Sequence, residues 1–103
     1  MLPPRDKEGF LKSLDDWNED VADALAQAEG IDLTPEHWEI IHVARDFHRE
    51  FALSPAMRIL VRRVRDTVGA EKGRSIHLLR LFPDRPARKI SKIAGLPKPT
   101  NCD

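Results

Sequence analysis

This sequence is poor in cysteine and in aromatic residues, and both shortages limit what the protein can be. Its 103 residues include one cysteine, no tyrosine and only 6% aromatic side chains. A single cysteine cannot close an internal disulfide, so the class of disulfide-stabilised secreted domains is excluded. The one thiol belongs to Cys102, the last residue but one of the sequence.

Long apolar runs are also missing, and we expect no secretory leader. No apolar stretch approaches the ~18 residues that indicate a membrane-spanning helix. The opening residues, MLPPRDKEGF, lack the apolar core of a secretory signal. Together with the free thiol, these observations predict a cytoplasmic protein without a membrane partner.

The sequence offers few of the motifs that mark cofactor, metal or pocket chemistry. It has no glycine-rich phosphate loop and no glycine-flanked nucleophilic serine. Its four histidines are His37, His42, His48 and His77. The first two are five residues apart and the next two are six apart, spacings that do not place two ligands on one helix face. We therefore expect no metal, no cofactor and no stand-alone catalyst.

Charge is balanced overall but not along the chain. Residues 1–53 carry 13 acidic and 5 basic side chains, a net charge of −8, whereas residues 54–103 carry 4 acidic and 12 basic ones, a net charge of +8. Two interpretations stay open at this point. Either the two halves attract each other within the fold, or the second half presents a basic face to an anion or an acidic partner.

Helical periodicity is the main structural signal that is present. Five segments predict helices or helical turns, at residues 18–30, 33–53, 54–69, 73–83 and 85–95. Residues 9–17 are compatible with either a short strand or a loop. We therefore predict a small, mainly α-helical domain in which the second and third helices form a helix-turn-helix-like pair.

Start and stop signals bound these helices. The expected N-caps are Asn18, Thr34 and Ser54. A proline follows both Thr34 and Ser54 in the first helical position, where its missing N–H costs nothing. The glycines expected to end helices are Gly30, Gly69 and Gly95. Apolar residues at helical spacing predict the core, among them Ile40, Val43, Phe47, Leu60, Val64, Leu78, Leu79, Leu81 and Phe82.

The final nine residues, GLPKPTNCD, differ from the rest of the chain. Their two prolines favour an extended conformation and prevent a helix. The sequence thus divides into one helical domain at residues 1–94 and a flexible C-terminal arm at residues 95–103, with Gly95 as a joint. A thiol on a projecting arm can enter the active site of another protein, as a carrier must.

The pKa of the Cys102 thiol stays open at this point. Two cations, Lys92 and Lys98, would lower it, whereas Asp103 and the terminal carboxylate would raise it. Several basic residues are candidates to attract anionic sulfur or an acidic partner, namely Lys92, Lys98, Arg58, Arg62 and Arg80.

Four motifs together point to one family: TPEHW, SPAMR, LFP and the terminal KIAGLPKPTNC. They resemble the DsrC/TusE family of sulfur-relay proteins, from about Glu8 to the end of the sequence. The resemblance implies a small helical fold, an N-terminal β-hairpin that is missing or reduced here, and a protruding C-terminal arm. It also implies that Cys102 carries sulfur as a persulfide.

The resemblance further implies partners. A TusE-type carrier takes sulfur from an upstream sulfurtransferase complex and passes it to the tRNA thiouridylase that makes 2-thiouridine at the wobble position. A DsrC-type protein works in dissimilatory sulfur metabolism beside sulfite reductase and uses a second cysteine eleven positions before Cys102. That position here is Ser91, which cannot form a disulfide, so the departure favours the single-cysteine, TusE-like role.

Two alternative hypotheses about the function stay open beside the TusE-like carrier. One is a DsrC-like protein acting in sulfite reduction or sulfur oxidation. The other is a regulatory DNA-binding module built on the helix-turn-helix-like pair, with Arg62 and Arg63 on its second helix. Direct nucleic-acid binding is not the expected role, because the basic half has only Phe82 as an aromatic partner for bases. A further departure from the family is the last residue, Asp103, where an apolar residue is usual.

Overall fold

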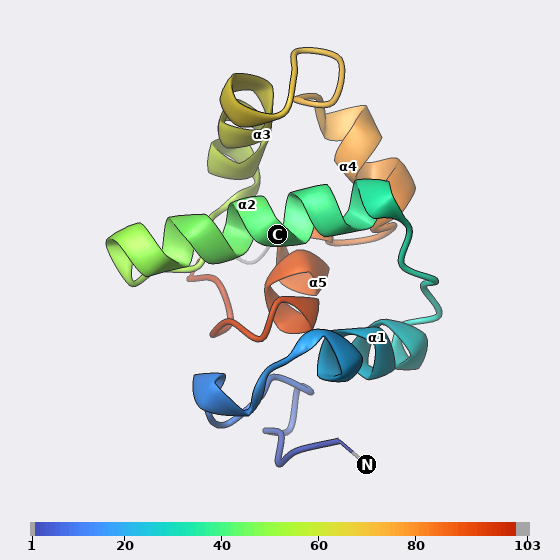
Figure 1. Ribbon diagram of the computed structural model, residues 1–103, viewed down its shortest axis with the longest axis vertical. Helices are drawn as coiled ribbons and strands as arrows, with labels where there is room; N and C mark the ends of the chain where they lie inside the picture. The colour runs from blue at the N-terminus through green and yellow to red at the C-terminus, as the bar shows by residue number, and fades with distance from the viewer. Residues whose placement is uncertain (1, 101–103) are drawn as a thin grey trace.

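The computed structural model describes residues 2–100, which fold into five α-helices, four of them arranged around the fifth (Figure 1). In chain order these are α1 (Glu19–Ala28), α2 (Pro35–Phe51), α3 (Met57–Thr67), α4 (Ser75–Leu81) and α5 (Pro86–Ile93), preceded by a 3-10 turn at Leu14–Asp16. The prediction of a mainly helical fold is confirmed.

The N-terminal segment forms only the remnant of a hairpin. A single antiparallel bridge joins Arg5 to Leu11, and no strand forms elsewhere in residues 2–100. The Asp6 carboxylate holds the turn by accepting hydrogen bonds from the backbone N–H groups of Glu8 at 2.9 Å and Phe10 at 3.0 Å. Residues 9–17, whose structure the sequence left open, therefore contain the end of this turn, the bridge residue Leu11 and the 3-10 turn at Leu14–Asp16.

Local signals placed the first two helices correctly. Asn18 accepts a hydrogen bond from the backbone N–H of Val21 at 2.8 Å, as an N-cap does. Gly30 follows α1 with φ +74°, the left-handed conformation that glycine adopts without strain. Thr34 caps α2 in a capping box whose third position is His37. These contacts span only a few residues, so the sequence alone reveals them.

The predicted start of the third helix was wrong. Ser54 does not cap it, because α3 begins at Met57 with Ala56 in the N-cap position. The Ser54 hydroxyl instead donates to the carbonyl oxygen of Pro97 at 2.5 Å, 43 residues further along the chain. The link between α2 and α3 runs over residues 52–56, where the sequence predicted the third helix to begin.

The short helix α5 is the centre of the molecule, contacting each of the other four helices (Figure 1). Ala87, Ile90 and Ile93 on its inner face are fully buried, and so is Ser91. Each buried isoleucine stabilises the fold by roughly 1.5–3 kcal/mol relative to an exposed one. Its basic residues occupy the outer face, so a helix that looks charged in sequence anchors the core.

The helix α4 is less buried than expected. Leu78 and Phe82 are fully buried, as predicted, but Leu79 is 42% exposed. A helix of seven residues packs only one side against α2, α3 and α5, which leaves Leu79 and its neighbour Ile76 on the outer side. The assignment of Leu79 to the core was therefore wrong.

Ion pairs join the acidic first half of the chain to the basic second half. Those between the halves include Arg63–Glu50, Lys72–Glu39, Arg88–Glu8, Lys92–Glu29 and Lys98–Glu8. The exposed pairs among them contribute only about 0–1 kcal/mol each, so these orient the halves more than they stabilise them. The interpretation that the halves attract each other is confirmed.

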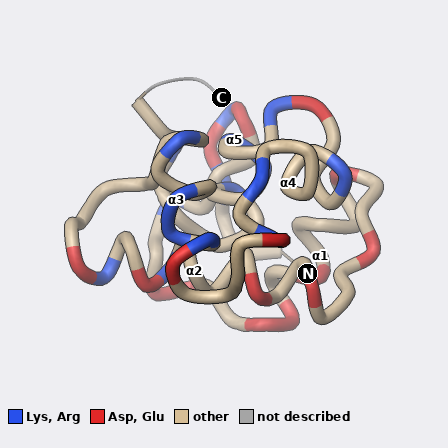
Figure 2. The backbone as a smooth tube through the Cα atoms, turned by 90° about the horizontal axis from the view of Figure 1, so that it is seen from above, with Lys and Arg blue, Asp and Glu red and all other residues tan. Residues whose placement is uncertain are grey.

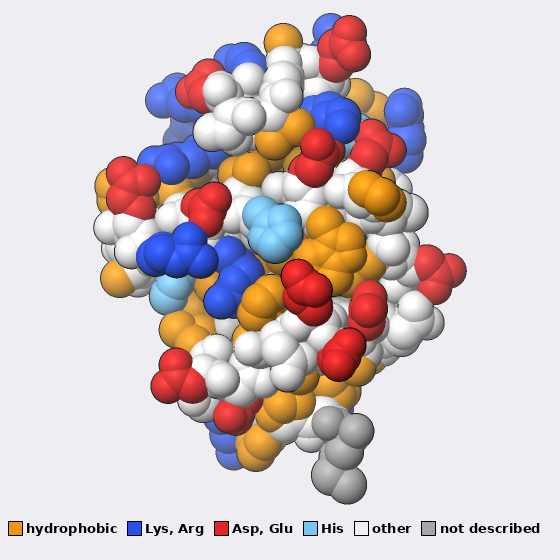
Figure 3. Space-filling model, in the orientation of Figure 1, with side chains coloured by type: hydrophobic (Ala, Val, Ile, Leu, Met, Phe, Trp, Pro, Cys, Tyr) orange, Lys and Arg blue, Asp and Glu red, His pale blue; other side chains and the backbone are white. Residues whose placement is uncertain are grey.

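A basic surface remains in addition to these pairs. Arg58, Arg62 and Arg65 on α3 are exposed and take part in no ion pair within residues 2–100. Figure 2 shows basic residues following one another along α3. In Figure 3 basic side chains are prominent over α3, whereas acidic ones are prominent over α1. The molecule thus keeps a basic side on which α3 lies.

Candidate functional site at the base of the C-terminal arm

The C-terminal arm leaves the fold directly after α5. Cys102, the predicted site residue, lies outside the described residues, so the geometry of the site is that of residues 95–100. Gly95 has φ +75°, and its N–H donates to the carbonyl of Lys92 at 3.1 Å. The next N–H, that of Leu96, donates to the carbonyl of Ser91 at 2.8 Å. This left-handed ending turns the chain back over α5 and buries Leu96.

Two side chains from other elements hold the end of α5. The indole Nε1 of Trp17 donates to the carbonyl of Ile93 at 2.8 Å, and Nη1 of Arg45 donates to the carbonyl of Ala94 at 2.6 Å. The guanidinium of Arg45 also lies 3.7 Å from the centroid of the Trp17 ring. We call this pair the Trp17–Arg45 clamp. It satisfies carbonyls that a helix end leaves without partners.

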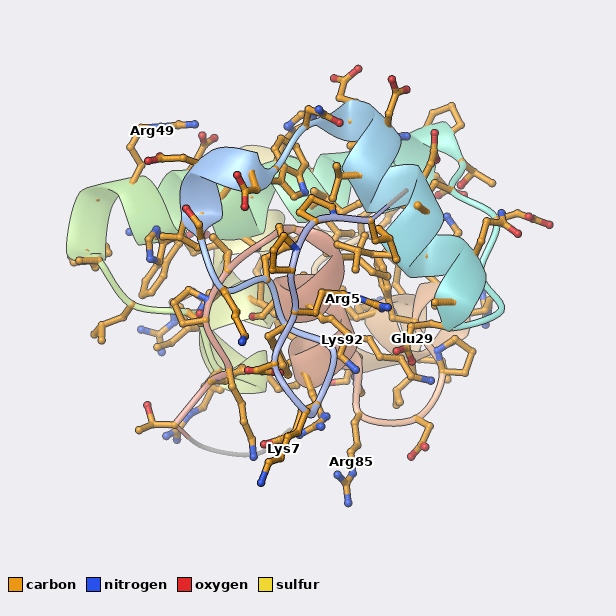
Figure 4. All side chains as sticks on the ribbon, turned by 90° about the horizontal axis from the view of Figure 1, so that it is seen from below. Arg5, Lys7, Glu29, Arg49, Arg85 and Lys92 are labelled. Atoms are coloured by element: carbon orange, nitrogen blue, oxygen red, sulfur yellow. The ribbon has the colours of Figure 1, made fainter. Side chains whose placement is uncertain are left out.

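Burial lowers the pKa of Arg45, but a guanidinium in a protein stays protonated. We therefore expect Arg45→Met to lower the free energy of unfolding by about 2 kcal/mol, since a charge-assisted hydrogen bond and the stacking on Trp17 are both lost. Chemical denaturation measures the change. The matched control is Arg49→Met on the same helix, whose side chain is 69% exposed and points away from the body (Figure 4). Equal losses in both variants would contradict a role for the clamp.

Beyond Leu96 the arm rests on the body of the protein. The Pro97 carbonyl accepts the hydrogen bond from Ser54, and Lys98 pairs with Glu8 at 2.8 Å. Pro99 is buried, and with Thr100 it lines a hollow of about 170 Å³. The rest of that hollow is lined by Phe47, Leu53, Ser54, Ala56 and Ile59, from the end of α2 and the start of α3. The flexibility expected of the arm stays a prediction.

The contact between Lys98 and Glu8 depends on pH. Hydrogen bonds from Lys98 and then Arg88 hold the pKa of Glu8 below its ordinary value of 4.5. A carboxylate with a lowered pKa stabilises the fold above its unfolded pKa, and this contribution is lost as the pH falls through the folded value. Protonation of Glu8 in acid therefore removes the ion pair between the arm and the N-terminal turn, whereas the Ser54–Pro97 hydrogen bond does not depend on it.

We expect acid release of the arm to show in hydrogen exchange. The amides of Leu96, Lys98 and Thr100 should exchange faster, relative to the intrinsic rate, as the pH falls below about 4.5. In Glu8→Gln this pH dependence should disappear, because no carboxylate is left to protonate. Glu50→Gln, which removes a carboxylate paired with Arg63 instead, should retain it. An unchanged pH profile in Glu8→Gln would contradict the assignment.

The lysines expected to tune the thiol already have anionic partners. Lys92 pairs with Glu29 at 3.1 Å, and its side chain is 12% exposed. It lies beside a polar hollow of about 520 Å³ between the N-terminal segment and α1, near Arg5 (Figure 4). Lys98 pairs with Glu8. The positive charge of each lysine is therefore partly neutralised by its carboxylate partner, which weakens its effect on any other group.

Ser91 lies beneath the first residues of the arm. It is fully buried, its carbonyl accepts from Leu96, and its hydroxyl has no hydrogen-bond partner among residues 2–100. Within residues 2–100 no three metal-ligating side chains come together. None of the helices formed by these residues is both long and apolar enough to cross a bilayer.

The model of the family described as DsrC-like protein matches residues 3–102. The chain belongs to the DsrC-like protein family. Among curated relatives, it is 52% identical to a protein named sulfurtransferase TusE from Escherichia coli K12, over 94% of this chain and 89% of the relative. It is 50% identical to the sulfurtransferase TusE homolog of Haemophilus influenzae, with the same coverage.

Solved structures agree with this family assignment. This DsrC-like protein superposes on DsrC from Allochromatium vinosum with a TM-score of 0.87 and 44% identity, covering 96% of this chain and 88% of the other. It matches the oxidized gamma-subunit of dissimilatory sulfite reductase (DsrC) from Archaeoglobus fulgidus with a TM-score of 0.85 and 38% identity, covering 98% and 92%. The predicted resemblance to the DsrC/TusE family is therefore confirmed.

Sequence reasoning missed the residues that position the arm in this DsrC-like protein. The sequence did not identify either member of the Trp17–Arg45 clamp. One indication was available, because Arg45 is a charged residue next to the apolar stripe of α2. His37, considered in the sequence as a metal ligand, has a structural role instead. It is buried, and its Nε2 lies 2.8 Å from the carbonyl oxygen of Leu81, which ties α2 to the end of α4.

Proposed function

We propose that this DsrC-like protein is a sulfur carrier of a TusE-type relay, in which Cys102 holds the sulfur as a persulfide. The observation that carries the proposal is 52% identity to a curated TusE sulfurtransferase over 94% of the chain. The family match also extends through residue 102. The anchored arm supports it further, because the last described residue, Thr100, stands two positions before the thiol.

The proposed chemistry moves one sulfur atom without net oxidation. The Cys102 thiolate attacks the outer sulfur of a donor persulfide, the donor leaves as a thiolate, and Cys102–S–SH forms. An acceptor then removes the outer sulfur, and the Cys102 thiolate returns. Lys98, the described cation nearest in sequence, is paired with Glu8, so the partner's active site supplies most of the rate.

The single thiol requires that sulfur leave the protein by way of a partner. No second cysteine exists in the chain to release the sulfur by forming a disulfide. The proposed donor is an upstream sulfurtransferase complex, and the proposed acceptor is the tRNA thiouridylase that makes wobble 2-thiouridine. The carrier itself then needs no metal, no cofactor and no contact with nucleic acid.

Sulfur loading tests this function directly. The reduced protein is incubated with a sulfurtransferase and thiosulfate, and its intact mass is measured. We expect a gain of one sulfur atom on the peptide that contains Cys102, reversed by a reductant. A mass that stays unchanged with several donors would refute the carrier function.

The structural likeness to DsrC from Allochromatium vinosum, at 44% identity, supports a second candidate function. This is a role as a DsrC-like partner in dissimilatory sulfur metabolism, with sulfite reductase in place of the thiouridylase. Transfer rates to the two acceptors distinguish the candidates. A Ser91→Cys variant tests whether the arm can move. An internal disulfide with Cys102 is expected to form only if the arm leaves Ser54 and Glu8 and uncovers residue 91.

A further inference from the structure

Three exposed apolar side chains lie around the base of the arm. They are Phe51, Leu53 and Ile59, which are 48%, 60% and 40% exposed, and we call them the arm-base patch. Leu53 and Ile59 line the hollow of about 170 Å³ beside Pro99. Phe51 joins them through Phe47, which also lines the hollow, with ring centroids 4.7 Å apart. Exposed apolar groups gathered in this way are typical of interaction surfaces.

The position of the thiol ties the patch to sulfur transfer. The arm is held by the Ser54–Pro97 hydrogen bond and the Lys98–Glu8 ion pair, and Thr100 lines the hollow. Two further residues of chain span at most about 7 Å, whatever their conformation. While the arm stays docked, the surface next to Thr100 is therefore within reach of a protein that binds the Cys102 sulfur.

Basic residues border this surface on the side of α3. The guanidinium carbon of Arg63 lies 5.1 Å from the ring centroids of both Phe47 and Phe51. Arg62 follows Ile59 by one helical turn, is exposed and forms no ion pair within residues 2–100. The area around the hollow thus combines an apolar centre with a basic edge.

The geometry points to the arm-base patch as the docking surface for the protein that exchanges sulfur with Cys102. This inference rests on the proposed function and adds where the partner binds and what its surface is. The partner presents an apolar contact region that fills the hollow, bordered by a carboxylate that faces Arg62, since Arg63 is already paired with Glu50. The same surface serves the donor and the acceptor in turn, because both must reach one thiol.

The test separates docking from thiol chemistry. Leu53→Asp and Ile59→Asp place a charge on the patch. Their matched controls are Ile76→Asp and Leu79→Asp on α4, where the wild-type side chains are 56% and 42% exposed. Each variant is loaded with glutathione persulfide, a small donor that needs no docking surface. Each is then assayed for sulfur exchange with the purified cognate donor complex and thiouridylase.

We expect the patch variants to load from glutathione persulfide at the wild-type rate and to exchange sulfur with both proteins at least about tenfold more slowly. The α4 controls should stay within about twofold of wild type, and exchange should slow with rising salt. Equal slowing in the patch and control variants would overturn the inference. So would faster loading of the patch variants by the small donor, because it would mean that the chain's own end covers the patch.

Failure of the proposed function gives a different result. If the wild-type protein takes no sulfur from glutathione persulfide or from any protein donor, the carrier function fails and the docking inference fails with it. If loading proceeds normally but the patch variants exchange sulfur as fast as wild type, only the docking inference fails. A shift from dimer to monomer in Leu53→Asp would also overturn it, since the patch would then bind a second copy of this chain.

Discussion

The Cys102→Ser chain is expected to support no 2-thiouridine synthesis in a relay reconstituted from the donor complex, this protein, the thiouridylase and tRNA. A serine hydroxyl stays protonated near neutral pH and cannot hold a transferable sulfur, whereas a thiol with a pKa near ~8.5 supplies a thiolate. The yield of thiolated tRNA should fall to that of a reaction without the carrier. The melting temperature should not change, which would show that the loss is chemical.

A variant with its thiol at another position on the arm tests how far the arm must reach for sulfur transfer. In the double variant Thr100→Cys with Cys102→Ser, the thiol retreats along the arm by at most about 7 Å. This variant should still accept sulfur from a small persulfide but relay little of it, because its thiol lies within the docked part of the arm. Full relay by the double variant would contradict a short, fixed reach and would show that the arm leaves the body during transfer.

The same substitution distinguishes the carrier from a DNA-binding module. A DNA binder would be indifferent to Cys102→Ser and would lose affinity, with a steep dependence on salt, when Arg62 and Arg63 are neutralised. A carrier, by contrast, would lose its relay activity with Cys102→Ser. Assaying both variants for relay activity and for DNA binding therefore assigns the role to one class.

Gly95→Ala is expected to destabilise the protein by about 3 kcal/mol. Gly95 has φ +75°, and a left-handed alanine costs roughly 1–2 kcal/mol. A Cβ at this position would also overlap the indole of Trp17, and overpacking costs typically about 1–3 kcal/mol more. Urea denaturation measures the loss, and the melting temperature should fall by roughly 10 °C or more.

The chain contains a close control for this prediction. Gly30 has φ +74°, nearly the same as Gly95, but no atom lies within 4 Å of the Cβ it would carry. Gly30→Ala should therefore cost only the backbone term of about 1–2 kcal/mol. In a Trp17→Ala background, Gly95→Ala should cost no more than Gly30→Ala, since the clash is gone. Equal costs for the two glycines in the wild-type background would show that Trp17 yields without strain.

The sequence alone was sufficient for features that depend on neighbouring residues. The Asn18 cap, the start of α2 at Thr34 and Pro35, and the end of α1 at Gly30 all involve contacts between residues a few positions apart. The prolines of the terminal segment predicted that it forms no helix, and residues 97–99 lie in none. The family, the mainly helical fold and the choice of Cys102 as the candidate carrier also came from the sequence, through motifs and resemblance.

The interpretation of Ser54 failed because two structures compete for one side chain. A serine followed by proline is a typical helix start, and nothing near Ser54 in the sequence argues against it. Its hydroxyl instead bonds to the carbonyl of Pro97, a partner that becomes available only when the arm packs on the body. The same limit explains Leu79, whose exposure depends on how many sides of α4 its neighbours cover.

What this sequence determined by itself is a short helical chain whose single thiol stands at the end of a proline-containing arm. Only the tertiary structure decided how that arm is held. Trp17 and Arg45 bond to the last carbonyls of α5 across separations of 76 and 49 residues, and Lys98 meets Glu8 across 90. No periodicity or local motif encodes such pairs, because they form only when the core has brought distant segments together.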